Sequence, residues 1–238
     1  MRTWSKEEIR DALRLYAVTD RSWLRGRDFK EVLAEALSVP GITCVQLREK
    51  HAAPEEKEAL AREAQALCAQ AGIPLLIDDD VELALCIGAD GVHIGQDDIP
   101  CAEARRTLGG QAIIGVTAKT LEQARKAEAE GADYLGVGAV FPTSTKQDTW
   151  TIDHEVLRQI CAAVSIPVVA IGGITADNAR ELAGTGIAGI AVVSAIFAQD
   201  DLADAVKHLS KVAKRFRYSL GEKTCGLDRY SRVGMRAV

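Results

Sequence analysis

The sequence has little that suggests a membrane or nucleic-acid surface. Its apolar runs, such as residues 73–77 and 166–171, are far shorter than the roughly 18 residues that a membrane span requires. Aromatic residues make up only 5% of the chain and the formal net charge is -5, whereas nucleic-acid surfaces combine basic stripes with stacking aromatics. The N-terminus has no apolar stretch followed by a small-residue cleavage site. We therefore expect a cytoplasmic protein with no membrane or nucleic-acid partner.

Paired cysteines and a glycine-rich turn are also missing. The six cysteines are scattered without a C-x-x-C pair, which argues against a zinc site or a redox dithiol and favours buried thiols. The first β-branched run leads into Thr19, Asp20 and Arg21, and not into the glycine-rich turn of dinucleotide-binding sheets. No Ser-His-Asp or Cys-His arrangement is apparent, so we expect no protein nucleophile.

What the sequence does contain is a regular alternation of short apolar segments with longer amphipathic ones. The strand candidates are residues 15–19, 42–47, 75–78, 91–94, 113–117, 134–138, 168–171 and 190–193. Between them, residues 54–70, 121–130 and 153–163 carry apolar side chains every three or four positions, as helices do. Eight β/α units in about 200 residues predict an α/β fold, a single (β/α)8 TIM barrel, with an open doubly wound sheet as the alternative.

The barrel accounts for residues 1–210, and residues 211–238 are interpreted as a basic C-terminal extension. From Lys211 onward there are eight basic residues against Glu222 and Asp228, and the apolar periodicity is lost. A loosely docked extension is the favoured interpretation, and a contact with a partner is the alternative.

Polar residues follow the second strand candidate, where a barrel places its reactive groups. The period-two alternation of a strand turns Gln46, Arg48 and Lys50 to the same side. One amide and two cations suit a diphosphate, which Arg48 can bind through two parallel hydrogen bonds. A solvated strand end is the alternative.

Acidic residues gather after the next two strand candidates. They are Asp78, Asp79, Asp80, Asp97 and Asp98. Five carboxylates at one rim repel one another unless a cation neutralises them, and Mg²⁺ bound by one carboxylate from each loop and by substrate phosphate would do so. Helix capping is the alternative for some of them. His93, on the fourth strand, is either a base or a structural residue.

A second anion site is expected at the loops that follow the seventh and eighth strands, and the loop after the sixth strand can also surround an anion. Thr143, Ser144, Thr145 and Lys146 place three hydroxyls and a lysine in four residues. Gly172 and Gly173 end the seventh strand and Ser194 follows the eighth, where barrels commonly bind phosphate with backbone amides. The chain thus has two candidate anion sites.

Taken together, these segments resemble the thiamine-phosphate synthase family. The matching motifs are LYAVTD at 15–20, VQLREK at 45–50, GVHIGQDD at 91–98, YLGVG at 134–138 with PTSTK at 142–146, and VVAIGGI at 168–174. They follow the family's order over about residues 13 to 210. The resemblance implies a Mg²⁺-dependent transferase of thiamine biosynthesis, which joins 4-amino-2-methyl-5-hydroxymethylpyrimidine diphosphate to 4-methyl-5-(2-hydroxyethyl)thiazole phosphate and releases pyrophosphate.

The same resemblance implies roles for individual residues. The diphosphate would be held by Gln46, Arg48, Lys50 and Lys146, the last three as catalytic residues, and Mg²⁺ by Asp79 and Asp98. The remaining substrate-binding residues would be Asp78, Thr117, Thr143, Ser144, Thr145, Gly173, Val193 and Ser194. The chain differs from the family's usual residues at Asp78, Thr117 and Lys119, where Asn, Ser and His are usual.

Two other functions are compatible with a barrel of this sequence. A thiazole tautomerase-like isomerase would need no residues for diphosphate and metal. A non-catalytic barrel would bind a phosphorylated ligand without converting it. The sequence leaves the oligomeric state open and is compatible with a homo-oligomer.

Overall fold

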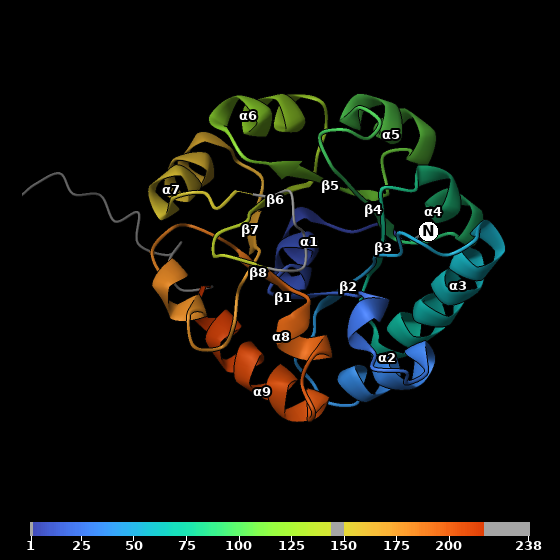
Figure 1. Cartoon of the computed structure of the whole chain (residues 1–238). Coiled ribbons are helices and arrows are strands. Elements are labelled where there is room, and N and C mark those ends of the chain that lie inside the picture. Colours follow the sequence, from blue (N-terminus) through green and yellow to red (C-terminus); the bar gives the residue numbers. More distant parts are fainter. Residues whose placement is uncertain (1, 144–149, 217–238) are drawn as a thin grey trace, which may run out of the picture.

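Eight parallel strands close into a barrel in the computed structural model of the chain, which describes residues 2–143 and 150–216 (Figure 1). The strands are β1 (Leu15–Val18), β2 (Cys44–Leu47), β3 (Leu75–Asp78), β4 (Gly91–Ile94), β5 (Ile113–Ala118), β6 (Tyr134–Gly138), β7 (Val168–Ile171) and β8 (Gly189–Val192). They pair in sequence order, and β1 pairs with β8 to complete the ring. The predicted barrel is confirmed, and the open doubly wound sheet is excluded by this closure.

Helical segments surround the strands (Figure 1). They are α1 (Lys6–Ala12), η1 (Arg21–Trp23), α2 (Phe29–Leu37), α3 (Pro54–Ala71), α4 (Val81–Ile87), α5 (Cys101–Leu108), α6 (Leu121–Ala129), α7 (His154–Ala163), η2 (Ala179–Leu182), α8 (Ser194–Phe197) and α9 (Leu202–Ala213). The helices α3, α6 and α7 match the sequence predictions closely. Between β7 and β8 the chain forms only the 3₁₀ turn η2 and no α-helix.

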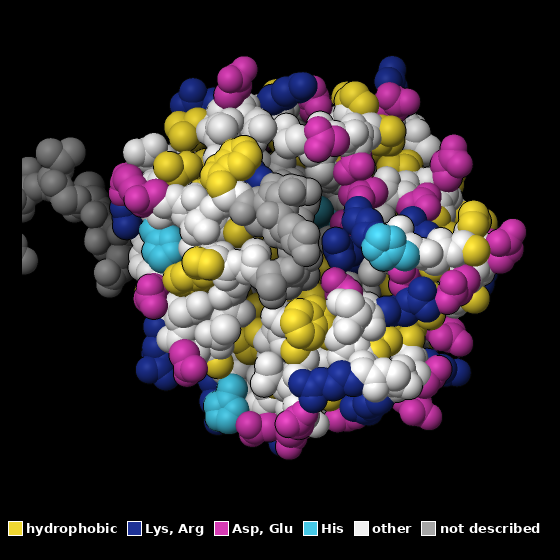
Figure 2. Space-filling view, viewed as in Figure 1, with side chains coloured by type: hydrophobic (Ala, Val, Ile, Leu, Met, Phe, Trp, Pro, Cys, Tyr) yellow, Lys and Arg dark blue, Asp and Glu magenta, His cyan; other side chains and the backbone are white. Residues whose placement is uncertain are grey.

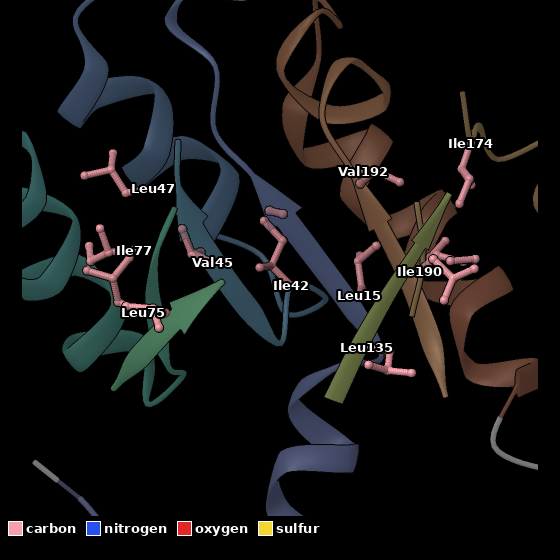
Figure 3. Close-up of a cluster of buried hydrophobic side chains, with 14 of the residues drawn as sticks. Leu15, Ile42, Val45, Leu47, Leu75, Ile77, Leu135, Ile174, Ile190 and Val192 are labelled. Carbon is pink, nitrogen blue, oxygen red and sulfur yellow. The ribbon is translucent and has the colours of Figure 1, made fainter. Parts of the chain in front are cut away.

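Side chains alternate between the two faces of the barrel wall. Leu15, Val45 and Leu75 point outward and pack with the surrounding helices, in the cluster shown in Figure 3. Tyr16 and Tyr134 point inward and belong to a second, smaller cluster inside the barrel. Consecutive apolar residues along each strand are therefore explained by burial on both faces.

One end of the barrel is covered by α1. This helix begins at Ser5, whose side chain and that of Glu8 form reciprocal hydrogen bonds with the backbone. Ile9 of this helix and Leu13, which follows its last residue, pack into the interior cluster. Figure 1 shows α1 lying across the centre of the ring. The opposite end of the barrel, at the C-terminal ends of the strands, is therefore the end that is open for functional groups.

The last helix crosses the boundary expected at residue 210. Helix α9 ends at Ala213, and Val212, Ala213 and Phe216 are buried in the core. These residues therefore belong to the barrel, whereas the extension predicted beyond them, residues 217–238, lies outside the described residues. No helix in the described part of the chain is long and apolar enough to cross a membrane.

Candidate active site

Many of the predicted site residues line one cavity at the C-terminal end of the strands. They are Gln46, Arg48, Asp78, Thr117, Thr143, Gly173, Val193 and Ser194. The cavity has a volume of about 170 Å³. Figure 2 shows that cationic and acidic side chains gather beside this mouth. Ser144, Thr145 and Lys146 lie outside the described residues, so their roles stay predictions.

Two cations and a buried carboxylate face one another at the ends of β2 and β3. The Nζ atom of Lys50 lies 3.1 Å from Oδ2 of Asp78, and Nε of Arg48 lies 3.8 Å from the same oxygen. Burial and the neighbouring Asp79 raise the pKa of Asp78, and Lys50 and Arg48 offset only part of this rise. The carboxylate that replaces the family's usual amide thus lies beside two cations that compensate its burial in part.

The loop after β2 is held by its own ion pairs. The Glu49 side chain is only 6% exposed and forms an ion pair with Arg21, which also binds Glu56 at 2.6 Å. The backbone N–H of Arg48 donates to Oγ1 of Thr19 at 3.1 Å. These contacts fix the loop between β2 and α3, so Arg48 is presented to the cavity from a rigid segment.

A pair of carboxylates, from Asp79 and Asp98, lies next to these cations. Asp79 has a φ of 62°, a left-handed conformation rare for a residue other than glycine, and its N–H donates to the His93 carbonyl at 2.8 Å. Asp98 accepts a hydrogen bond of 2.7 Å from the N–H of Gly95. Lys50 forms an ion pair with Asp79, so the two loops and the strand end β2 meet here.

The side chains of Asp79 and Asp98 interact with each other, and this interaction shifts their two pKa values in opposite directions. Burial and the contact with Asp79 raise the pKa of Asp98. For Asp79, burial acts in the same direction, but hydrogen bonds with Asp98 and Lys50 outweigh it and lower the pKa. Two adjoining carboxylates at an open rim have the donor chemistry that suits a hard cation.

Within residues 2–143 and 150–216, no three or more His, Cys, Asp or Glu side chains gather closely enough to hold a metal by themselves. Mg²⁺ usually takes only one or two protein carboxylates and completes its octahedron with water and substrate phosphate. Asp80 has another role, since it caps α4 by accepting a hydrogen bond of 2.9 Å from Leu83 and so fulfils the capping alternative.

The loops on the other side of the cavity are made of small residues. Gly173 has a φ of 66°, and a Cβ atom there would lie 2.3 Å from the Pro142 carbonyl oxygen, so only glycine fits. The Nδ2 atom of Asn178 donates to the Gly173 carbonyl at 2.9 Å and fixes the turn. With Val193 and Ser194 at the end of β8, this turn leaves room for a ligand close to the backbone.

A buried polar network inside the barrel was missed at the level of sequence. The hydroxyls of Tyr16 and Tyr134 lie 3.0 Å apart, and burial raises the pKa of both tyrosines well above the ordinary value. Gln46 contacts Tyr16, and His93 joins Tyr134 to Thr117. The signal that was available is position, because both tyrosines occupy inward-facing places in otherwise apolar strands.

The fold and the cavity define a TIM-barrel protein with a cavity at the C-terminal mouth, where cations and paired carboxylates face small-residue loops. The family model described as thiamine monophosphate synthase matches residues 15–196. The chain belongs to this family, as the motifs in the sequence indicated.

Similar proteins cover most of the chain. A thiamine-phosphate synthase of Clostridium tetani is 47% identical over 196 residues, which are 82% of this chain and 93% of that protein. One from Chloroflexus aurantiacus is 49% identical and covers 82% of this chain and 90% of its own. The solved structure of thiamine phosphate pyrophosphorylase from Pyrococcus furiosus has a TM-score of 0.80 at 41% identity, covering 87% of this chain and 98% of its own.

Proposed function

We propose that this protein is a thiamine-phosphate synthase that joins 4-amino-2-methyl-5-hydroxymethylpyrimidine diphosphate to 4-methyl-5-(2-hydroxyethyl)thiazole phosphate and releases pyrophosphate. The observation that carries the proposal is the shared cavity. Arg48 and Asp78 line it on one side, and Gly173 and Ser194 line it on the other. A reaction that joins two phosphorylated molecules needs two anion-binding regions facing one space.

The proposed reaction is a dissociative displacement at the pyrimidine CH₂ group. The bond between this carbon and the diphosphate oxygen breaks, and the pyrophosphate leaves with the electron pair. The aminopyrimidine ring delocalises the resulting positive charge, and the lone pair of the thiazole nitrogen then forms the new C–N bond. No protein nucleophile takes part.

The chain's own contribution is to bind and stabilise the leaving group. Arg48 offers a planar guanidinium for two oxygens of the diphosphate, and Lys50 offers a mobile point charge. Both approach from a loop held by the pair of Glu49 and Arg21, so little reorganisation is needed as charge develops. Lys146 would add a third cation from the loop after β6.

The metal site is part of the proposal. Asp79 and Asp98 would hold Mg²⁺, which when bound neutralises charge on the diphosphate oxygens. Lys50 pairs with both Asp78 and Asp79, so it can remain on Asp78 when Asp79 takes a metal ligand's role. Asp78 thereby holds Lys50 beside the diphosphate, and this is the role we propose for the carboxylate that stands where the family usually has an amide.

The test is to mix the two substrates with Mg²⁺ and to measure pyrophosphate release. We expect turnover in the wild type, a loss without Mg²⁺, and at least about tenfold slower turnover in Asp79→Ala, Asp98→Ala and Lys146→Ala, a factor that corresponds to about 1.4 kcal/mol. Asp97→Ala is the matched control, because it removes a carboxylate from the same loop as Asp98 and should retain the wild-type rate.

Other outcomes distinguish the rival functions. Isomerised thiazole phosphate without pyrophosphate would identify a tautomerase, and substrate binding without either product would identify a binding protein. Wild-type rates in Asp79→Ala and Asp98→Ala would refute the metal site while leaving the synthase activity in place. The cytoplasmic location and a homo-oligomeric state are further predictions, to be checked by fractionation and by light scattering.

A further inference from the structure

A continuous chain of hydrogen bonds runs through the barrel interior from Gln46 to Thr117. Nε2 of Gln46 donates to the Tyr16 hydroxyl at 2.7 Å, and this hydroxyl lies 3.0 Å from that of Tyr134. The Tyr134 hydroxyl lies 2.9 Å from Nδ1 of His93, whose Nε2 lies 3.0 Å from Oγ1 of Thr117. Both ends of the chain line the cavity at the mouth.

Proton counting gives this chain a direction. Tyr16 accepts from Gln46, and its other bond in the described structure is to Tyr134, so its own proton is satisfied when it donates to Tyr134. Tyr134 then donates to Nδ1 of His93. The reverse direction would aim two donors at Tyr16 and leave its buried proton without an acceptor among the described residues, which is unfavourable for a buried hydroxyl.

The direction fixes the protonation of His93. An Nδ1 atom that accepts a hydrogen bond is unprotonated, so the neutral ring carries its proton on Nε2 and donates it to Thr117. The Thr117 hydroxyl thus accepts from the protein, and its own proton remains to be donated elsewhere. Thr117 lines the cavity, so an atom of a ligand bound there can accept this proton.

The backbone makes room for this network. A Cβ atom at Gly115 would lie 2.0 Å from Cζ of Tyr134, and one at Gly136 would lie 2.8 Å from Cε1 of His93. The Tyr134 ring therefore occupies space left open by a glycine on the adjacent strand β5, and the His93 ring occupies space left open by a glycine on β6, two strands away. Two such accommodations show that the barrel is built around these rings.

We propose that Tyr16, Tyr134 and His93 are positioning residues, which set the Thr117 hydroxyl as a hydrogen-bond donor to an oxygen of the substrate's diphosphate. The inference rests on the proposed synthase function for the identity of the acceptor. It assigns His93 a positioning role, because its two ring nitrogens contact the hydroxyls of Tyr134 and Thr117. Of the two roles expected for His93 from the sequence, the proposal favours the structural one.

The first test reads the tautomer directly and does not depend on activity. In the ¹⁵N-histidine-labelled full chain, two-bond ¹H–¹⁵N correlation spectra identify which ring nitrogen is protonated, and loss of one signal set in His93→Gln assigns the residue. We expect an unprotonated Nδ1 and a protonated Nε2. A ring protonated on Nδ1 overturns the proposal, whatever the enzyme's turnover.

Two substitutions make this test specific. Tyr134→Phe removes the donor to Nδ1, so the two tautomers of His93 should both become populated. Tyr16→Phe is the matched control, because it also removes one hydroxyl but leaves Tyr134 to donate to His93, and the tautomer should not change. A change that is equal in both variants would contradict the directed chain.

The second test asks whether the network acts through Thr117. Thr117→Val should lower kcat/KM for the pyrimidine diphosphate about tenfold by removing the donor, and Tyr134→Phe should lower it about threefold or more. In the Thr117→Val background, Tyr134→Phe should cause no further loss. Multiplying losses would overturn the proposal, and Thr117→Ser, which keeps the hydroxyl, should restore sensitivity to Tyr134→Phe.

The two tests separate this proposal from the proposed function. A protonated Nε2 in a wild-type protein that releases no pyrophosphate would refute the synthase activity and leave the directed chain standing. A protein that releases pyrophosphate with Nδ1 of His93 protonated would do the opposite. If Tyr134→Phe does not fold, the wild-type spectrum alone decides the direction.

Discussion

Two glycine residues, which have a hydrogen atom in place of a side chain, determine how the barrel interior is packed. Gly115 and Gly136 face inward on β5 and β6, and the rings of Tyr134 and His93 lie where any larger side chain would put its Cβ atom. Interiors packed at crystal density cannot absorb an added carbon without moving their neighbours. The polar network therefore depends on two residues that make none of its hydrogen bonds.

We predict that Gly115→Ala destabilises the protein by about 1–3 kcal/mol, the usual cost of overpacking a core. The cause is the fully buried Tyr134 ring, which has no room to retreat. The free energy of unfolding from urea denaturation measures this. Gly110→Ala is the control, since its Cβ would meet nothing within 4 Å, and it should change stability by no more than about 0.5 kcal/mol. Equal stabilities of the two variants would contradict the steric argument.

The connections between helices and strands explain a repeated tripeptide. Gly-Ala-Asp occurs at residues 88–90 and again at 131–133, each time between a helix and the next strand. Both glycines have positive φ, both alanines are buried, and both aspartates accept a backbone N–H of the preceding strand. Asp90 binds Leu75 at 3.0 Å and Asp133 binds Ile114 at 2.8 Å. The tripeptide thus links the start of one strand to the preceding strand, at the end of the barrel remote from the cavity.

Asp133 tests this connection. Asp133→Ala should destabilise the protein by about 1–3 kcal/mol, because it leaves the Ile114 N–H without its acceptor and also removes the ion pair with Arg105. Asp133→Asn retains an acceptor oxygen and should lose less. Thermal or urea unfolding measures both, and pyrophosphate release should be unchanged in folded protein. A slower reaction in Asp133→Asn at full stability would show that this end of the barrel affects the site.

Residues 2–143 and 150–216 form one closed barrel, and the last helix described in this part of the chain packs against its wall. Helix α9 packs on α2 and on β1, the strand that β8 must meet to close the barrel. Its Val206, Leu209 and Val212 are buried on one face. The end of the chain is therefore needed at the seam of the barrel up to Phe216, six residues beyond the boundary that loss of periodicity suggested.

Two truncations place that boundary by experiment. A chain ending at Ser210 loses the buried side chains of Val212 and Phe216, at about 1.5–3 kcal/mol for each large apolar group, which is a large part of a typical domain's stability. A chain ending at Phe216 keeps them. We expect a much lower Tm for the first and wild-type Tm and turnover for the second. Loss of turnover in the chain ending at Phe216 would assign a catalytic contribution to residues 217–238.

The sequence predicted the barrel because its signals are local and repeated. Each strand is a short apolar run, and burial on both faces makes those runs nearly uniform, so eight of them were countable. The position of Phe216 could not be predicted in this way, since one aromatic residue after a helix carries no period. The 3₁₀ turn after β7 was missed for a similar reason, because Thr175 and Asn178 use their side chains to close the turn.

The site was predictable where charge marks it and not where geometry does. Arg48 and Asp78 stand out as polar residues at apolar strand ends. Tyr16 and Tyr134 do not, since a tyrosine inside a strand is ordinary until its hydroxyl is found facing another one. The direction of the network depends on which atoms meet across the barrel, and no spacing along the chain encodes that.

The position of α1 determines how ligands enter and leave the barrel. Ile9 and Leu13 block the end of the barrel opposite the cavity, so in a condensation both reactants and both products pass through the same mouth. A molecule bound deeper in the cavity than the other would then have to bind first and leave last. Closure of one end of the barrel thus makes the order of ligand binding and release at the other end depend on how deep each ligand lies.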